Sequence, residues 1–238
     1  TIVSKEIEYE VYSLPAALMM QHNMSQEVVA NLNNYLDVLR SDKHKESASK
    51  FLVGQIRQGE QLSMDYMDNL LTPFVSIVES LGMAYLKHFV EYTKSPLKPK
   101  KISIDKLWSV HSYEGDYNPI HDHGTKTVMG ISCTTWTRVP SQILQGPRPG
   151  SQEYDLYGAS GESDGCLCFN YGQSSTWDRE RLKPTQNVVV RPQVGRLYMF
   201  PSWMQHMVYP FQGEGERRTV AANINCFPVE GSQDGNKH

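Results

Sequence analysis

Three histidines in the second half of the chain have the types and spacing of a metal site. His121 and His123 stand two residues apart in the stretch Asn118-Pro119-Ile120-His121-Asp122-His123-Gly124, so on an extended segment their imidazoles point to the same side. His206 follows 83 residues after His123 and would complete the site from a distant strand. Three protein ligands on one face of an iron ion leave the other face open for a cosubstrate and dioxygen, which a closed structural metal site does not.

A basic residue follows the third histidine at a spacing that suits an anion site. Arg217 lies eleven residues beyond His206, and Thr219 follows two residues later. In a strand Arg217 and Thr219 face one side, whereas Arg218 faces the other. A planar guanidinium suits a buried carboxylate. We therefore predict that Arg217 and Thr219 bind an anion, and that replacing Arg218 has almost no effect on this binding.

These residues resemble the Fe(II)- and 2-oxoglutarate-dependent oxygenase superfamily, in particular its bacterial and phage branch with an Asn-Pro-x-His-x-His stretch. The resemblance lies between residues 108 and 226, and the matching positions are Asn118, Pro119, His121, His123, Gly130, Gly195, Leu197, Phe200, Pro201, Ser202, Trp203, His206, Val208, Pro210 and Arg217. It implies a double-stranded β-helix that binds Fe(II) through His121, His123 and His206. It also implies that Arg217 and Thr219 bind 2-oxoglutarate, and that dioxygen is consumed as a substrate is hydroxylated with release of succinate and carbon dioxide.

The chain departs from the family pattern at two places. Most of the superfamily has a carboxylate where this chain has His123; Asp122 could reach the metal instead, but strand alternation turns it away, so we favour His123. The branch also has Ser-Gly-x-Tyr-Tyr where this chain reads Met129-Gly130-Ile131-Ser132-Cys133. We predict that Tyr113, eight residues before His121, replaces those tyrosines as a cosubstrate contact.

Two other functions fit the same residues. One is a three-histidine, cupin-type dioxygenase that binds its substrate directly to the metal and needs no 2-oxoglutarate. The other is a metal-binding or ligand-binding β-barrel without catalytic activity. Arg217 argues against the first, because such an enzyme needs no second carboxylate site, and a succinate assay separates both from a 2-oxoglutarate-dependent enzyme.

Composition is that of a soluble globular protein. The chain has 238 residues, 39% of them hydrophobic and 21% charged, and we predict one domain over residues 1–238. No apolar run approaches the roughly 20 residues of a membrane helix. The net charge of -3 gives no basic footprint for a nucleic acid, so we expect a small-molecule or peptide substrate. The four cysteines are scattered and are predicted to be reduced core thiols in a cytoplasmic protein, whose oligomeric state we leave open.

Hydrophobic patterning divides the chain into a helical preface and a β-rich core. Residues 1–101 are predicted to hold one helix capped by Ser25 and another starting at Thr72-Pro73, with an irregular stretch between residues 40 and 60. We predict a jelly-roll core over residues 102–228 and a tail over 229–238. The expected strands are Ile102–Tyr113, Thr127–Thr137, Cys166–Tyr171, Asn187–Arg191, Arg196–Phe200 and Arg217–Phe227.

A long connector and two tryptophans complete these expectations. Residues 141–186 are rich in Gly, Pro and Ser but also carry aromatic side chains, and we predict a mobile lid that borders the substrate mouth. Trp108 and Trp203 are predicted to pack near the cavity, because indoles bury a large apolar area.

Overall fold

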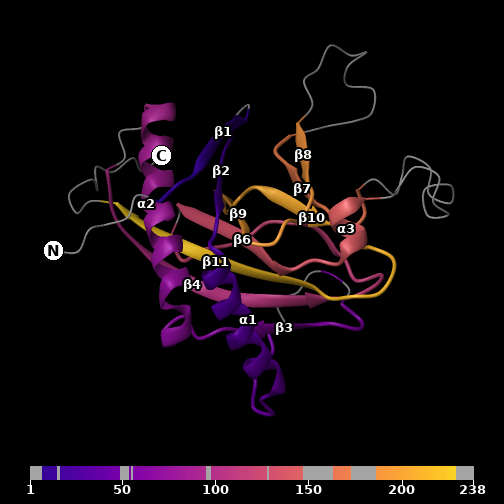
Figure 1. Cartoon of the computed structure of the whole chain (residues 1–238). Coiled ribbons are helices and arrows are strands. Elements are labelled where there is room, and N and C mark those ends of the chain that lie inside the picture. The colour runs from indigo at the N-terminus through magenta and orange to yellow at the C-terminus, as the bar shows by residue number, and fades with distance from the viewer. Residues whose placement is uncertain are drawn as a thin grey trace, which may run out of the picture.

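Two antiparallel sheets face each other in the computed structural model, which describes residues 7–14, 17–48, 54, 56–94, 98–127, 129–146, 163–172 and 186–228 (Figure 1). The larger sheet has the order β1 (Glu10–Leu14), β2 (Ala17–Asn23), β9 (Arg196–Pro201), β6 (Gly130–Arg138), β11 (Arg217–Pro228), β4 (Pro99–Ser112) and β3 (Glu60–Ser63). The smaller sheet has the order β5 (Asn118–His121), β10 (Gln205–Val208), β7 (Leu167–Asn170) and β8 (Asn187–Val190). From β4 to β11 the chain passes repeatedly between the two sheets, as a double-stranded β-helix does, so the predicted fold is confirmed.

The N-terminal part contributes strands as well as helices, which corrects the expectation of a purely helical preface. β2 pairs with β9, with Met20 opposite Met199, and β3 pairs with β4. Residues 17–22 are all buried, because alternate side chains of β2 enter two different hydrophobic clusters. A strand buried on both faces shows no alternation of polar and apolar residues, and this one therefore left no strand pattern in the sequence.

The two predicted helices are present and cover one face of the larger sheet (Figure 1). α1 (Gln26–Ser41) begins after Ser25, whose side chain accepts a hydrogen bond from the backbone of Val28. α2 (Thr72–Thr93) follows the short 3-10 helix η2 (Asn69–Leu71) and buries residues such as Phe74 and Val78 against the sheet. The helical stretch Asn69–Thr93 is long and apolar enough to span a membrane by length and composition, a test that a partly buried core helix also meets.

All six strands predicted for the core are observed, with ends shifted by up to three residues. β5 and β10 were not among the six expected strands, because a strand of four residues is too short to show a period. Only the spacing of the histidines indicated an extended segment at His121 and a strand at His206. The connector 141–186 contains α3 (Ser141–Gln145) and β7. Residues 147–162 and 173–185, on which the lid prediction depends, and the tail 229–238 lie outside the described residues.

Two hydrophobic clusters hold the layers together. The larger one lies between the helices and the larger sheet and includes Leu32, Leu81 and Ile224. The smaller one lies between the two sheets, where Phe169 and Phe200 pack edge to face at 4.8 Å between ring centroids. The four cysteines are buried and free, as predicted, and burial raises the pKa of Cys133 to about 12, so this residue is a neutral thiol.

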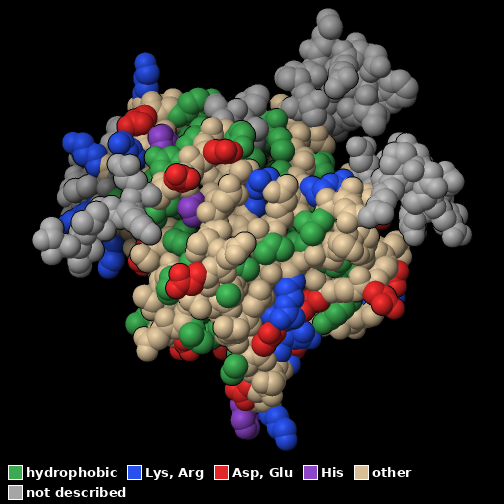
Figure 2. Space-filling model, in the orientation of Figure 1, with side chains coloured by type: hydrophobic (Ala, Val, Ile, Leu, Met, Phe, Trp, Pro, Cys, Tyr) green, Lys and Arg blue, Asp and Glu red, His purple; other side chains and the backbone are tan. Residues whose placement is uncertain are grey.

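The charged surface has no single sign. Figure 2 shows acidic and basic side chains spread over the same face, among hydrophobic and other side chains. A protein that binds a nucleic-acid backbone commonly presents a continuous basic patch. On this face the basic side chains are interspersed with acidic ones.

Arg218 lies on the face of β11 opposite to Arg217, as predicted, but it is buried and not solvated. Its guanidinium donates to Glu216 at 3.0 Å from both Nε and Nη2, and it forms an ion pair with Asp37 of α1 at 2.7 Å. His111 of β4 contacts the same Glu216 at 2.6 Å. Burial alone would raise the pKa of Glu216, yet the hydrogen bonds from His111 and Arg218 bring it well below its usual range.

We expect Arg218→Ala to lower the free energy of unfolding by about 1.5 to 3 kcal/mol, because it removes the fully buried partner of Glu216 and Asp37, while Arg138 still pairs with both carboxylates. Urea denaturation at neutral pH measures the loss. Arg196→Ala, which removes a half-buried arginine at the start of β9, serves as a matched control with a small effect. Equal stabilities of the two variants would contradict a structural role for Arg218.

Candidate metal centre and cosubstrate cavity

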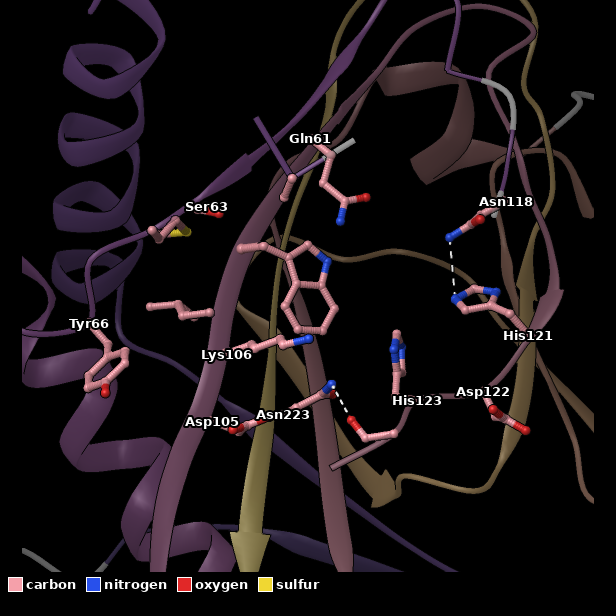
Figure 3. Close-up of a pocket in the computed structure, with 15 residues that line it drawn as sticks. Gln61, Ser63, Tyr66, Asp105, Lys106, Asn118, His121, Asp122, His123 and Asn223 are labelled. Carbon is pink, nitrogen blue, oxygen red and sulfur yellow. Dashed lines mark hydrogen bonds between the residues drawn. The ribbon is translucent and has the colours of Figure 1, made fainter. Parts of the chain in front are cut away.

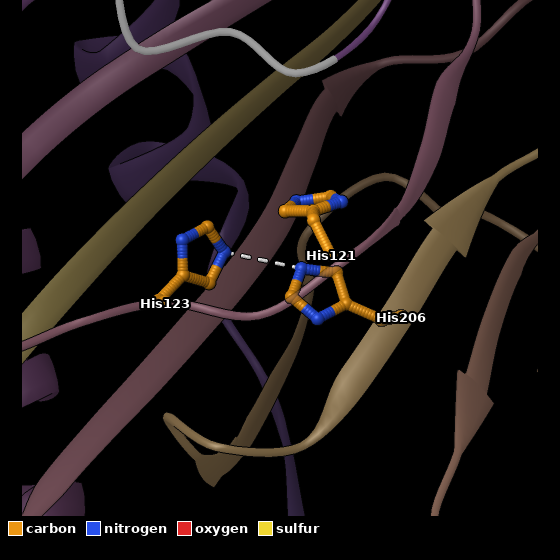
Figure 4. Close-up of side chains that lie close together, drawn as sticks. All are labelled: His121, His123 and His206. Atoms are coloured by element: carbon orange, nitrogen blue, oxygen red, sulfur yellow. Dashed lines mark hydrogen bonds between the residues drawn. The ribbon is translucent and has the colours of Figure 1, made fainter.

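The three predicted histidines come together between the two sheets (Figure 4). His121 ends β5 and is the register partner of His206 on β10. His123 lies two residues further along, where its backbone N–H donates to the carbonyl of Ser202 at 2.9 Å. One ligand atom from each of the three side chains lies within 4.8 Å of the others, so the group could hold one metal ion.

Backbone carbonyls fix the orientation of two of the rings. His121 Nδ1 lies 2.7 Å from the carbonyl of Pro119, and His206 Nδ1 lies 2.9 Å from the carbonyl of Met204. A carbonyl only accepts hydrogen bonds, so both rings carry their proton on Nδ1 and present the lone pair of Nε2. His206 Nε2 lies 3.1 Å from His123 Nε2; because His206 has its proton on Nδ1, His123 Nε2–H is the donor of this hydrogen bond in the metal-free protein. A metal ion would replace this contact by binding both nitrogens.

Burial keeps the three imidazoles neutral, which is the form that binds a metal. Desolvation lowers the pKa of His123 to about 3, with a further contribution from His206 and His121. It also lowers the pKa of His206 to about 4 and brings the pKa of His121 below its usual value. Asp122 is exposed, and its carboxylate points away from the rings of His121 and His123 (Figure 3).

We expect the affinity for Mn(II) to stay nearly constant between about pH 8 and about pH 6, whereas ordinary histidines with a pKa of about 6.5 would lose affinity in this range. The sign follows from the pKa values, which burial lowers at all three histidines: protons compete with the metal at a lower pH than they would at ordinary histidines, and at His206 only near pH 4. Calorimetric titration with Mn(II) across this range is the measurement. A steep loss that begins near pH 6.5 would contradict the burial of the histidines.

A small cavity joins the histidines to Arg217. It has a volume of about 70 Å³, and its lining includes the three histidines, Arg217 and Thr219, as the strand alternation predicted. The Arg217 side chain donates to the carbonyls of Gly165 at 3.0 Å and Tyr209 at 3.1 Å, whereas its buried Nε has no hydrogen-bond partner. We call this space the inner cavity.

The charge state of Arg217 suits an anionic ligand. Burial lowers its pKa to about 10, so the guanidinium still carries its charge at neutral pH. A buried cation with an unpartnered N–H costs free energy unless an anion pairs with it. Three neutral imidazoles and one unsatisfied guanidinium in the same cavity therefore fit a metal together with a carboxylate ligand.

A larger cavity of about 350 Å³, the outer cavity, adjoins the inner cavity at His121 and His123 (Figure 3). It shares four wall residues with the inner cavity, namely Trp108, Asn118, His121 and His123. Its remaining wall carries polar side chains, among them Gln61, Lys106 and Asp122. Gln61 is only 7% exposed, and its amide points into the cavity (Figure 3).

The structure does not bring Tyr113 to either of these cavities. Tyr113 follows Ser112, the residue opposite Arg217 in the sheet, so its side chain falls on the opposite side and interacts with Arg40 of α1. Ser112 and Tyr117 line the inner cavity instead. The alternation that selected Arg217 would also have selected Ser112, had the pairing of β4 with β11 been known.

The two tryptophans differ in their environment. Trp108 lines both cavities, and its ring centroid lies 5.3 Å from that of His123, as expected for a packing residue of the site. Trp203 is 54% exposed, so the expectation that it packs inside was wrong. Gln61, Lys106 and Asn118 were not predicted as wall residues; they lie on β3, β4 and β5, which meet around the cavity only in the folded chain.

The fold and the site together define a class of protein: a double-stranded β-helix with a histidine metal centre and a buried arginine that can bind a carboxylate, as in non-haem iron oxygenases. Residues 106–223 match the model of the family described as "Putative 2OG-Fe(II) oxygenase". The chain belongs to this family, whose members use Fe(II) and 2-oxoglutarate. No curated protein matches the chain in sequence.

Three solved structures share the fold of this chain. A prolyl-4-hydroxylase from Pseudomonas putida is 13% identical with a TM-score of 0.53, over 87% of this chain and 91% of that one. The α-ketoglutarate-dependent carbocyclase SnoK from nogalamycin biosynthesis is 12% identical with a TM-score of 0.55, over 91% and 84%. HygX from Streptomyces hygroscopicus, solved with nickel and 2-oxoglutarate, is 9% identical with a TM-score of 0.52, over 87% and 82%. At these identities the likeness shows the fold.

Proposed function

We propose that this protein hydroxylates a small molecule or a peptide, using Fe(II), 2-oxoglutarate and dioxygen and releasing succinate and carbon dioxide. The observation that carries the proposal is the unpartnered Nε of the buried Arg217, which lies in the same cavity as three neutral histidines. A metal site alone would not need this cation. A dicarboxylic cosubstrate would satisfy both ends of the inner cavity.

Five residues of the inner cavity would bind the metal or the cosubstrate in this proposal. His121, His123 and His206 would hold the iron through Nε2, because two of the three Nδ1 atoms are committed to backbone carbonyls. Arg217 and Thr219 would bind the carboxylate of 2-oxoglutarate that lies far from the metal. Bound iron and 2-oxoglutarate would supply the oxidising power for hydroxylation of a C–H bond.

The surroundings of the site would control water and charge. Phe200 closes the inner cavity on the side of the hydrophobic cluster, with Phe169 packed against it, and the ring centroids of Phe200 and His206 lie 5.1 Å apart. A dry wall strengthens the attraction between Arg217 and a bound carboxylate. The three neutral ligands leave the charge of the iron uncompensated, which favours an anionic cosubstrate over water.

The outer cavity is our proposed substrate site. Its volume suits a small molecule or one or two residues of a peptide, and it opens beside the histidines and not beside Arg217. The amide of Gln61 and the ammonium group of Lys106 offer hydrogen bonds to a polar substrate, while Trp108 offers an apolar surface. A substrate held here would approach the metal from the side opposite to the cosubstrate carboxylate.

Two measurements on the iron-loaded protein test this function. Calorimetry under anaerobic conditions should show stoichiometric binding of 2-oxoglutarate, and incubation with a cell extract in air should produce succinate together with a product heavier by 16 Da, the mass of one oxygen atom. Oxygen consumption without succinate would favour the cupin-type dioxygenase. Failure to bind 2-oxoglutarate and to consume oxygen would favour a barrel without catalytic activity.

A further inference from the structure

Asn118 contacts an atom that the metal centre needs. Its side-chain nitrogen Nδ2 lies 3.3 Å from His121 Nε2 (Figure 3). Asn118 is the first residue of β5, three residues before His121, and it belongs to the wall that the inner and outer cavities share. None of the functions given above to the histidines, Arg217 or Thr219 requires this amide.

The chemistry of His121 fixes which end of the amide faces it. Because His121 Nδ1 donates to the carbonyl of Pro119 at 2.7 Å, His121 Nε2 has a lone pair and no proton. The oxygen of the Asn118 amide would repel that lone pair, whereas its NH₂ group donates to it. The amide nitrogen therefore occupies the same lone pair through which His121 would bind the metal.

The oxygen end of the Asn118 amide makes no hydrogen bond that would stabilise it in this position. Asn118 Oδ1 is buried without a hydrogen-bond partner. Gly54 packs directly over it, since a Cβ on Gly54 would lie 2.7 Å from Oδ1. A leucine would fill nearly the same volume without burying an unsatisfied oxygen. An amide at this place is thus explained by its NH₂ end and not by its packing.

We propose that Asn118 is a positioning residue that competes with the metal for His121. In the metal-free protein its N–H holds the lone pair of His121 Nε2 and keeps the ring aimed at the site. Once a metal takes that lone pair, the N–H is released at the boundary of the two cavities, where it can donate to an oxygen atom of the cosubstrate. The second step rests on the proposed function; the first rests only on the contacts of the metal-free protein.

The first experiment measures the affinity for Co(II) alone in the wild-type protein and in Asn118→Leu. Loss of the competing hydrogen bond should make Co(II) bind about two to ten times more tightly, the range that corresponds to one net hydrogen bond. Asn34→Leu makes the same chemical change at an exposed position of α1 and is the matched control. Weaker or unchanged Co(II) binding in Asn118→Leu, at wild-type thermal stability, would overturn the proposal.

A second readout does not depend on metal loading. In ¹⁵N spectra of the imidazole nitrogens of the metal-free protein, His121 Nε2 should shift toward the position of a free lone pair in Asn118→Leu, while His206 Nε2 stays unchanged. A merely structural Asn118 would move both signals or neither, and either result would overturn the proposal. Should the leucine variant fail to fold, Asn118→Ala allows the same two measurements.

The second step, in which the Asn118 N–H donates to the cosubstrate, is tested by calorimetry with 2-oxoglutarate on the Co(II)-loaded proteins. Asn118→Leu should bind 2-oxoglutarate about two to ten times more weakly than the wild type, although it binds Co(II) more tightly. Opposite changes in the two affinities are not expected from general damage to the fold. If 2-oxoglutarate binds equally well to both, the second step is wrong. If it binds to neither, the proposed function fails, while the Co(II) and imidazole measurements still decide the first step.

Discussion

His206→Ala is expected to abolish stoichiometric metal binding and all turnover, with the fold retained. The side chain supplies one of three ligand atoms, and loss of even an outer partner of a metal ligand typically lowers affinity about 10-fold to 100-fold, so loss of a ligand itself should exceed about 100-fold. The sheet should persist, because the smaller hydrophobic cluster keeps Phe169 and Phe200 in contact. Metal analysis after desalting and circular dichroism are the measurements.

The control for this variant must be an exposed histidine. His111→Ala would be a poor choice, because His111 is fully buried and contacts Glu216 at 2.6 Å. His44→Ala is suitable, because His44 is exposed in the segment after α1. If His206→Ala retains stoichiometric iron and the full rate of succinate formation, the assignment of the metal centre is wrong.

Arg217→Ala is expected to weaken 2-oxoglutarate binding by about 2 to 5 kcal/mol, because truncation leaves the buried carboxylate of the cosubstrate without its charged partner. Iron content should barely change, since Arg217 is not among the metal-binding atoms. Arg217→Lys should recover only part of the loss, because an ammonium group cannot reproduce the planar fork of a guanidinium. Calorimetry on the metal-loaded proteins measures all three affinities.

Stability has to be followed alongside affinity in these variants. Arg217 also donates to the carbonyls of Gly165 and Tyr209, so its removal loosens two segments that border the inner cavity. Arg196→Ala is the matched control, because Arg196 lies outside the lining of both cavities. Normal 2-oxoglutarate affinity in Arg217→Ala at unchanged melting temperature would show that the anion is bound elsewhere.

Much of the site could be predicted because its residues obey a short-range rule. Alternation along a strand separates Arg217 from Arg218 and His123 from Asp122, and in the structure each pair indeed faces opposite sides. Helical periodicity and a capping serine likewise located α1. These patterns depend only on neighbouring residues, so they can be read without knowing which strands pair.

The features that escaped prediction depend on pairing or on burial. Ser112 was overlooked in favour of Tyr113 because the choice follows from the register of β4 against β11. The burial of Arg218 was also missed, since nothing in the local sequence announces that α1 covers that face of β11. The amide of Gln61, on β3 of the larger sheet, meets the histidines only because the two sheets face each other in the folded chain.

β11 bears on the question of which part of this chain could be produced alone. The family match begins at residue 106. Arg218, the neighbour of the residue that would bind the cosubstrate, nevertheless forms an ion pair with Asp37, which lies about seventy residues before the start of the match. A fragment cut at the start of the match would expose the hydrophobic face beneath α1 and α2 and leave Arg218 without that carboxylate. We expect such a fragment to aggregate, so the boundary of sequence similarity is not the boundary of an expressible catalytic unit.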